Sequence, residues 1–224
     1  GEIASAIGAP RSTTYTIVDS MVSRAFLQRS EDGLVSLGPK IALLGLAFER
    51  GSTIIQAART IVHDLSQETG EIAELNVLDN WKQLVLLAEN GPRQFYLRSV
   101  EGGRYPIPQT ASGRFLVQGR SPEEILASIP EADYVGSNGV RQTAKQFLGD
   151  IEQAKTDGFA CTRGLIEPNV ACIAVPIYNH SGKCVAAISL VMTITNFDDR
   201  ETALVESVRN AGERLSAQMG NFSF

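Results

Sequence analysis

The residues best suited to covalent or metal chemistry in this 224-residue chain are its three cysteines and two histidines. Cys161, Cys172 and Cys184 stand 11 and 12 residues apart, and the histidines are His63 and His180. A Cys–His pair can form a nucleophile, but Cys172 lies in an apolar run, where a thiol usually packs as a small hydrophobic group. No C-x-x-C or H-x-x-x-H spacing is present. We therefore expect no metal site, and an enzyme that uses Cys172 as its nucleophile is the alternative function.

A second segment suits ligand binding. Residues 108–114 read Pro-Gln-Thr-Ala-Ser-Gly-Arg, and small side chains at the start of a helix leave room for a ligand close to the backbone. The amides of a first helical turn favour an anion such as a carboxylate. Tight packing of a helix on a sheet explains the same small residues, so both interpretations stay open. The spacing of a glycine-rich phosphate loop is absent, and we expect no cofactor.

Composition and charge exclude several classes of protein. Apolar residues make up 43% of the chain, but the longest apolar stretches are about eight residues, too short to cross a bilayer. Three scattered cysteines give no disulfide framework, which favours the cytoplasm. The net charge of −5 argues against general binding of polyanions. Residues 1–50 carry five basic and five acidic groups, so this neutral part of the chain can still contact phosphates locally.

The elements that would present such contacts form a small head at residues 1–39. Apolar spacing predicts a helix over residues 2–7, a stop at Gly8, and a second helix of about 14 residues that Pro10 opens. A hairpin should follow, with its turn at residues 30–33. This order is typical of a winged helix-turn-helix. An ordinary small α/β subdomain with unused surface hydroxyls is the other interpretation.

The second helix of this head would turn hydroxyls and an arginine away from its apolar stripe, which consists of Thr14, Ile17, Val18, Met21 and Val22. Serine, threonine and tyrosine hydroxyls can bond phosphates or base edges in a major groove. The hairpin adds one basic residue placed to touch the DNA backbone. The candidate DNA-contacting residues are Arg11, Ser12, Thr13, Tyr15, Thr16 and Arg29.

Residues 40–69 have a helical pattern interrupted at Gly51-Ser52, and they are interpreted as a helical linker or dimerisation region. Four large apolar residues (Leu43, Leu44, Leu46 and Phe48) exceed what one buried stripe needs. The surplus favours a helix that packs on a second chain, although a well-buried helix in one monomer would also explain it.

Residues 70–224 alternate between strand and helix patterns and predict an α+β domain, in which antiparallel hairpins bracket helices. A final helix should lie across the sheet. The expected strands are 71–78, 83–89, 95–100, 159–162, 170–178 and 185–193, and the expected helices are 112–117, 122–129, 143–157 and 198–219.

Five short stretches occur in this order along nearly the whole chain, and together they resemble the IclR family of bacterial transcription regulators. They are Gly8-Ala9-Pro10-Arg11-Ser12-Thr13, Val35-Ser36-Leu37-Gly38-Pro39, Thr110-Ala111-Ser112-Gly113-Arg114, Gly158-Phe159-Ala160 leading on to Cys172-Ile173-Ala174-Val175-Pro176-Ile177, and Val185-Ala186-Ala187-Ile188-Ser189.

The resemblance implies an α+β fold with an N-terminal winged helix-turn-helix and a C-terminal GAF-like antiparallel-sheet effector domain. It implies binding of double-stranded operator DNA by a homodimer or tetramer, under the control of a small organic or aromatic acid. The family normally has a further helix before the residue numbered 1 here. The effector-binding residues that the resemblance carries over are Ala111, Ser112, Thr162, Cys172 and Ser189.

The sequence departs from the family at two places. Thr16 stands where the second helix of the head commonly carries an arginine. Thr162-Arg163-Gly164 replaces residues that are commonly acidic in the family. Arg163 is either a cation that pairs with an acidic effector or a surface residue, and we favour the surface.

Overall fold

A computed structural model describes residues 1–92, 97–137 and 139–220 of the chain. The structure divides into two compact units, residues 1–52 and residues 53 onward. Within the described ranges, no helix combines the length and apolar character needed to cross a membrane.

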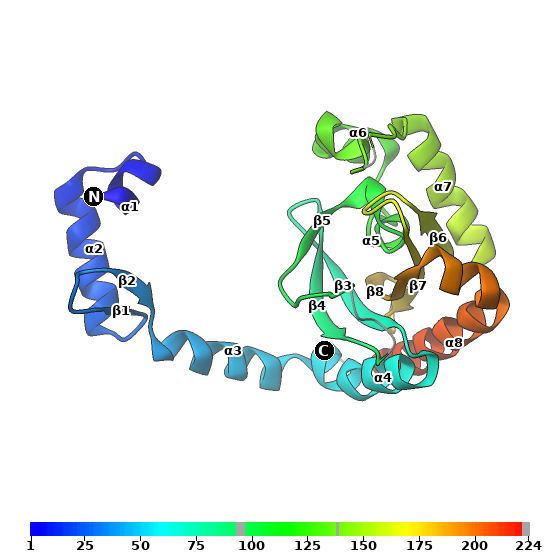
Figure 1. Ribbon diagram of the computed structural model, residues 1–224, viewed down its shortest axis with the longest axis horizontal. Helices are drawn as coiled ribbons and strands as arrows, with labels where there is room; N and C mark the ends of the chain where they lie inside the picture. The colour runs from blue at the N-terminus through cyan, green and yellow to red at the C-terminus, as the bar shows by residue number, and fades with distance from the viewer. Residues whose placement is uncertain (93–96, 138, 221–224) are drawn as a thin grey trace. The chain divides into compact units, whose positions relative to one another are not determined.

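The first unit consists of helices followed by a small antiparallel hairpin, as the sequence predicts (Figure 1). Strand β1 pairs with β2 through Leu27 opposite Leu37, and Gly33 closes the turn with a φ of 82°. The predicted stripe on the second helix is only partly buried: Thr14 and Val18 are covered, whereas Ile17 and Met21 are exposed within this single chain. The elements are α1 (Glu2–Ala6), α2 (Arg11–Ser23), β1 (Leu27–Arg29), β2 (Val35–Leu37) and α3 (Pro39–Gly51).

The second unit is built on a six-stranded, fully antiparallel sheet with the order β5-β4-β3-β8-β7-β6. Asn80 and Trp81 both have positive φ angles in the tight turn that joins β3 to β4. The strands are β3 (Ile72–Asp79), β4 (Lys82–Glu89), β5 (Arg104–Pro106), β6 (Ala160–Arg163), β7 (Val170–Tyr178) and β8 (Cys184–Thr193).

One predicted strand, 95–100, is not found. Residues 95 and 96 lie outside the described residues, and residues 97–100 form no strand. The side chain of Asn90 donates to the Ser99 carbonyl and accepts from the Ser99 N–H, at 3.2 and 3.0 Å. These bonds satisfy the backbone of Ser99 without a neighbouring strand. The strand that pairs with β4 comes later, at β5.

Two helices of the second unit, α6 and α7, begin where their capping residues predict. Thr143 and Gln146 form a reciprocal capping box at the start of α7, and Gly158 ends that helix with a φ of 74°. Ser121 accepts a hydrogen bond from the Glu124 amide at the start of α6. The α-helices are α4 (Thr53–Thr69), α5 (Gly113–Leu116), α6 (Pro122–Ser128), α7 (Ala144–Asp157) and α8 (Ile194–Gly220).

The two faces of the sheet differ in character because successive side chains of a strand point to opposite sides. One face carries large apolar residues, such as Leu75, Ile173 and Leu190, and packs against α4 and α8 (Figure 1). The opposite face carries small or polar residues at the alternate positions, among them Glu74 and Ser189. The short helix α5 and the longer α7 cover only part of this second face, which leaves room for a cavity.

Candidate functional site

A cavity of about 580 Å³ lies on the second face of the sheet. Its floor comes from β3, β4, β7 and β8, and its sides come from residues 97–99, 110–112 and 166–169. Ligand sites for small molecules commonly enclose roughly 300–1,000 Å³. The cavity is therefore large enough for a molecule with a single ring.

Four of the five predicted effector-binding residues line this cavity: Ala111, Ser112, Cys172 and Ser189. Thr162 does not line it. Thr162 is buried on β6, directly opposite Cys172 in the strand register, so it lies beside Cys172 on the same face of the sheet, one strand farther from the cavity. The structure thus brings together residues from three distant parts of the chain.

Packing and the cavity involve different residues of the small-residue segment. A Cβ atom on Gly113 would lie 2.1 Å from the Ile107 carbonyl oxygen, so this glycine is required by packing. Ala111 and Ser112 instead line the cavity. Their backbone amides are buried and make no hydrogen bond with any described residue. Two such neighbouring N–H donors suit an acceptor group on a ligand.

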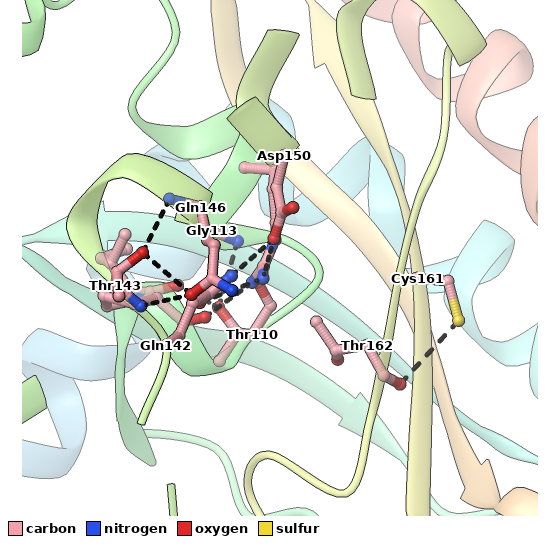
Figure 2. A network of polar contacts seen from close by, with 11 residues as sticks. Thr110, Gly113, Gln142, Thr143, Gln146, Asp150, Cys161 and Thr162 are labelled. Carbon is pink, nitrogen blue, oxygen red and sulfur yellow. Dashed lines mark hydrogen bonds and ion pairs between the residues drawn. The ribbon is translucent and has the colours of Figure 1, made fainter. Parts of the chain in front are cut away.

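Arg114 holds the segment that carries these amides. Its guanidinium is 3% exposed, and Nη1 donates to the carbonyl oxygens of Pro108 and Thr110 at 2.8 and 2.6 Å. Nη2 donates to Asp150 Oδ2 at 2.9 Å. Figure 2 shows this network, which joins the loop at Thr110 to Gln142 and Asp150. Arg114 is therefore a structural cation that fixes the cavity edge, and it is not free to pair with a ligand.

The resemblance did not point to Asn76, a buried residue directly behind the cavity wall. Its Nδ2 donates to Ser189 Oγ at 2.8 Å and to Ser112 Oγ at 3.3 Å. The same nitrogen lies 3.3 Å from Glu74 Oε2, and Oδ1 accepts from Gln83 Nε2 at 2.9 Å. One amide thus positions four residues that line the cavity. The signal for it was present in the sequence, because Glu74 and Asn76 are polar residues two apart in a strand of otherwise apolar character.

The electrostatic character of the cavity is set by a buried carboxyl. Burial raises the pKa of Glu74, and the hydrogen bonds from Asn76 and Ser189 oppose that rise only in part. Burial, together with the nearby Glu74, also raises the pKa of Tyr105. Arg98, at an exposed position, is the basic residue of the described lining.

The alternative of a cysteine-dependent enzyme is not supported. Burial raises the pKa of the Cys172 thiol, and the charge of Glu74 raises it further. A thiol held in its protonated form is a poor nucleophile. Neither histidine belongs to the described lining of the cavity. The described part of the chain contains no group of three residues that could hold a metal ion.

The six candidate DNA-contacting residues are all exposed, five on α2 and Arg29 on β1. Arg29 is partly engaged, since its guanidinium lies 2.7 Å from Asp19 Oδ1. The other basic residue that the sequence left open, Arg163, forms an ion pair with Asp198 and lies over the ring of Phe197 at 4.4 Å. Arg163 does not line the cavity, which agrees with its assignment to the surface.

Comparison with known proteins decides the family. A sequence profile described as the C-terminal part of the bacterial transcriptional regulator IclR matches residues 49–217. The chain belongs to the IclR family. It is 27% identical to the HTH-type transcriptional regulator XynR of Escherichia coli (strain K12) over 98% of this chain and 88% of that protein. It is 25% identical to the regulator KipR of Bacillus subtilis (strain 168), with the same coverage.

Solved structures of IclR proteins have the same fold. An IclR homolog from Microbacterium hydrocarbonoxydans, complexed with 4-hydroxybenzoate, superposes with a TM-score of 0.82 at 28% identity, over 97% of this chain and 89% of that one. The Thermotoga maritima IclR gives a TM-score of 0.75 at 22% identity, over 98% of this chain and 90% of that one. The relatives named here are transcriptional regulators, a class of protein that is not enzymatic.

Proposed function

We propose that this IclR-family chain binds double-stranded operator DNA and that a small organic or aromatic acid in its cavity controls this binding. Residues 1–39 are the winged helix-turn-helix, residues 40–69 the connector, and residues 70–224 the GAF-like effector domain. The cavity of about 580 Å³ carries the proposal, since its lining includes apolar side chains and two backbone amides that bond to no residue of the described ranges. Because bacterial DNA lies in the cytoplasm, we place the protein there.

The carboxylate of the effector binds at the amides of Ala111 and Ser112. Ser189 offers a hydroxyl to the rest of the effector, and Cys172 contributes a small side chain to the cavity lining. Thr162 packs beside Cys172 on the neighbouring strand. The 4-hydroxybenzoate complex of one relative supports this class of ligand. Ligands that bind only the folded protein raise its melting temperature.

A thermal-shift screen of carboxylic and phenolic acids tests the effector site. We expect at least one acid to raise the melting temperature, and Ala111→Leu to abolish that rise because leucine fills the cavity. Ala127→Leu, the same change at an exposed position of α6, is the matched control. A rise that survives unchanged in Ala111→Leu would place the acid elsewhere.

Arg11, Ser12, Thr13, Tyr15, Thr16 and Arg29 are the proposed DNA contacts, and a gel-shift series with upstream DNA tests them. Affinity should fall steeply with salt, and Arg11→Ala should lower the salt slope by about one. Arg141→Ala, at an exposed ion pair in the second unit, should change neither. An acid found by thermal shift should alter the DNA affinity. Failure of the full-length protein to retard any upstream fragment would refute DNA binding.

A second copy of this chain covers α3 in the proposed dimer or tetramer. This helix exposes large apolar side chains, including Leu43 at 64% and Phe48 at 63%. Light scattering should give an oligomer for the wild type and smaller species for Leu43→Glu. Leu126→Glu changes an exposed leucine of the second unit and should leave the mass unchanged. A monomeric wild type would contradict the proposed assembly.

A further inference from the structure

One wall of the cavity has more hydrogen-bond acceptors than donors. Gln83 and Glu74 both line the cavity, and both are 4% exposed. Gln83 donates through Nε2 to Asn76, but its Oε1 is buried and has no hydrogen-bond partner among the described residues. Glu74 offers its carboxyl oxygens beside it, with Oε2 accepting from Ser189 at 3.2 Å.

The protein donors that contact this wall bond to other groups than the Gln83 oxygen. The two hydrogens of Asn76 Nδ2 face three acceptors, namely Glu74 Oε2, Ser112 Oγ and Ser189 Oγ. The Ser189 hydroxyl donates to Glu74. The Ser99 hydroxyl also lines the cavity, and like the Gln83 oxygen it is buried and has no hydrogen-bond partner among the described residues. Because buried polar groups without partners are costly, the Gln83 oxygen suits a donor group on a ligand.

The neighbouring side of the cavity has the opposite polarity. The Ala111 and Ser112 amides are donors with no acceptor in the described part of the chain. The Asn76 side chain bonds to both Ser112 and Gln83. The donor side and the acceptor side therefore adjoin one central amide. A small molecule that carries an acceptor group and a donor group close together can satisfy both sides at once.

We infer that Gln83 and Glu74 form a subsite for a hydroxyl group of the effector, so that the effector is a hydroxy-substituted acid. The inference rests on the proposed function, since it assumes that the carboxylate binds at Ala111 and Ser112. A second carboxylate does not suit the subsite, because it would face the buried Glu74 carboxyl and offer another acceptor to Gln83. A hydroxyl group can donate its proton to Gln83 Oε1 or to a carboxyl oxygen of Glu74.

Matched pairs of acids test the subsite on the unmodified protein. Titration calorimetry compares 3- and 4-hydroxybenzoate with benzoate and with the methoxybenzoates, which keep the oxygen but lack the donor. The pair 3-hydroxypropionate and propionate repeats the comparison without a ring. We expect the better hydroxy acid of a series to bind at least about tenfold more tightly than its partners, since a buried hydrogen bond is left unmade without it.

Two variants locate the preference. Gln83→Met removes the unpaired oxygen at similar side-chain length and should reduce the preference for the hydroxy acid to within about twofold. Gln118→Met, the same change at a glutamine that does not line the cavity, should keep the preference.

The possible outcomes distinguish a failure of the hydroxyl subsite from a failure of the proposed acid site. Equal affinity for hydroxy and unsubstituted acids overturns the hydroxyl subsite and leaves the proposed acid site standing. A preference that persists in Gln83→Met overturns the assignment to this wall. Absence of binding by both series overturns the acid site and the subsite together. Because the ligand pairs use the wild-type chain, the test does not depend on the folding of Gln83→Met.

Discussion

Replacing Arg114 by methionine should destabilise the second unit, because this guanidinium donates to two buried carbonyl groups. The oxygens of Pro108 and Thr110 accept from Nη1 at 2.8 and 2.6 Å. The Thr110 oxygen keeps the Gly113 N–H as a second donor at 3.2 Å, whereas the Pro108 oxygen loses its donor, which costs about 1–3 kcal/mol. The guanidinium also lies 5.3 Å from the ring centroid of Phe147, a contact worth about 0.5–2 kcal/mol.

The loss on the Asp150 side should be small, since that side chain is 45% exposed and water can replace the guanidinium. Methionine also removes the free-energy cost of burying a charge, which offsets part of the lost stability. The same cost explains why burial lowers the pKa of Arg114. We expect a net loss of about 2–4 kcal/mol. With a denaturant dependence of about 2 kcal/mol/M, the urea midpoint falls by roughly 1–2 M.

Urea unfolding followed by tryptophan fluorescence measures this loss in the correct unit, because Trp81 is the single tryptophan of the chain and lies in the β3–β4 turn. Arg214→Met is the matched control. Arg214 pairs with Asp64 at 3.1 Å, and both side chains are about half exposed, so its loss should stay below about 1 kcal/mol. If the two variants shift the midpoint equally, the reasoning from buried carbonyl groups is wrong.

Three further predictions follow from the same site. Glu74 has a raised pKa in the folded chain, so its contribution to stability is fully present below the unfolded pKa of about 4.3 and is lost as the pH rises through the folded pKa. Glu74→Gln should remove this dependence on pH. The free energy of unfolding of the variant relative to the wild type should therefore grow with pH, by about 1.4 kcal/mol for each unit by which folding raises the pKa of Glu74. A difference in stability that stays constant between pH 5 and 9 would contradict this. Gly113→Ala should cost more than about 2 kcal/mol in thermal unfolding because its Cβ meets the Ile107 carbonyl, whereas Gly149→Ala, with open space around it in α7, should stabilise by up to about 1 kcal/mol. Burial raises the pKa of Cys184 to about 11 and raises that of Cys172 as well, so iodoacetamide at pH 8 should modify both thiols more slowly in the folded than in the urea-unfolded chain; rapid labelling of folded Cys172 would revive the enzymatic alternative.

Most of the secondary structure could be predicted from the sequence because its signals are local. Thr143 and Gly158 mark the two ends of α7, and residues 170–178 form the predicted strand β7 to the residue. The missed strand at 95–100 shows where local reasoning ends. The Asn90 side chain lies nine residues from Ser99 and satisfies its backbone, and no pattern of apolar residues reveals such a bond.

The candidate site was predictable only in part, for the same physical reason. Small residues such as Ala111 and Ser112 stand out in a sequence, whereas the roles of Gln83 and Asn76 depend on which strands become neighbours. Thr162 shows that even the neighbour of a lining residue can lie outside the cavity. It is buried beside Cys172, yet one strand of sheet separates it from the cavity. The assignment of Arg114 to structure required its four partners, which lie between four and 36 residues away.

The turn between α4 and β3 has a mechanical consequence. Glu71 is fully buried and bonded to Asn196 and Arg200, and Arg200 also donates to the carbonyl oxygen of Thr69 at 2.9 Å. These bonds tie the end of α4 to the strand whose first residue, Ile72, lines the cavity. We therefore expect a bound molecule that displaces β3 to move α4 together with it.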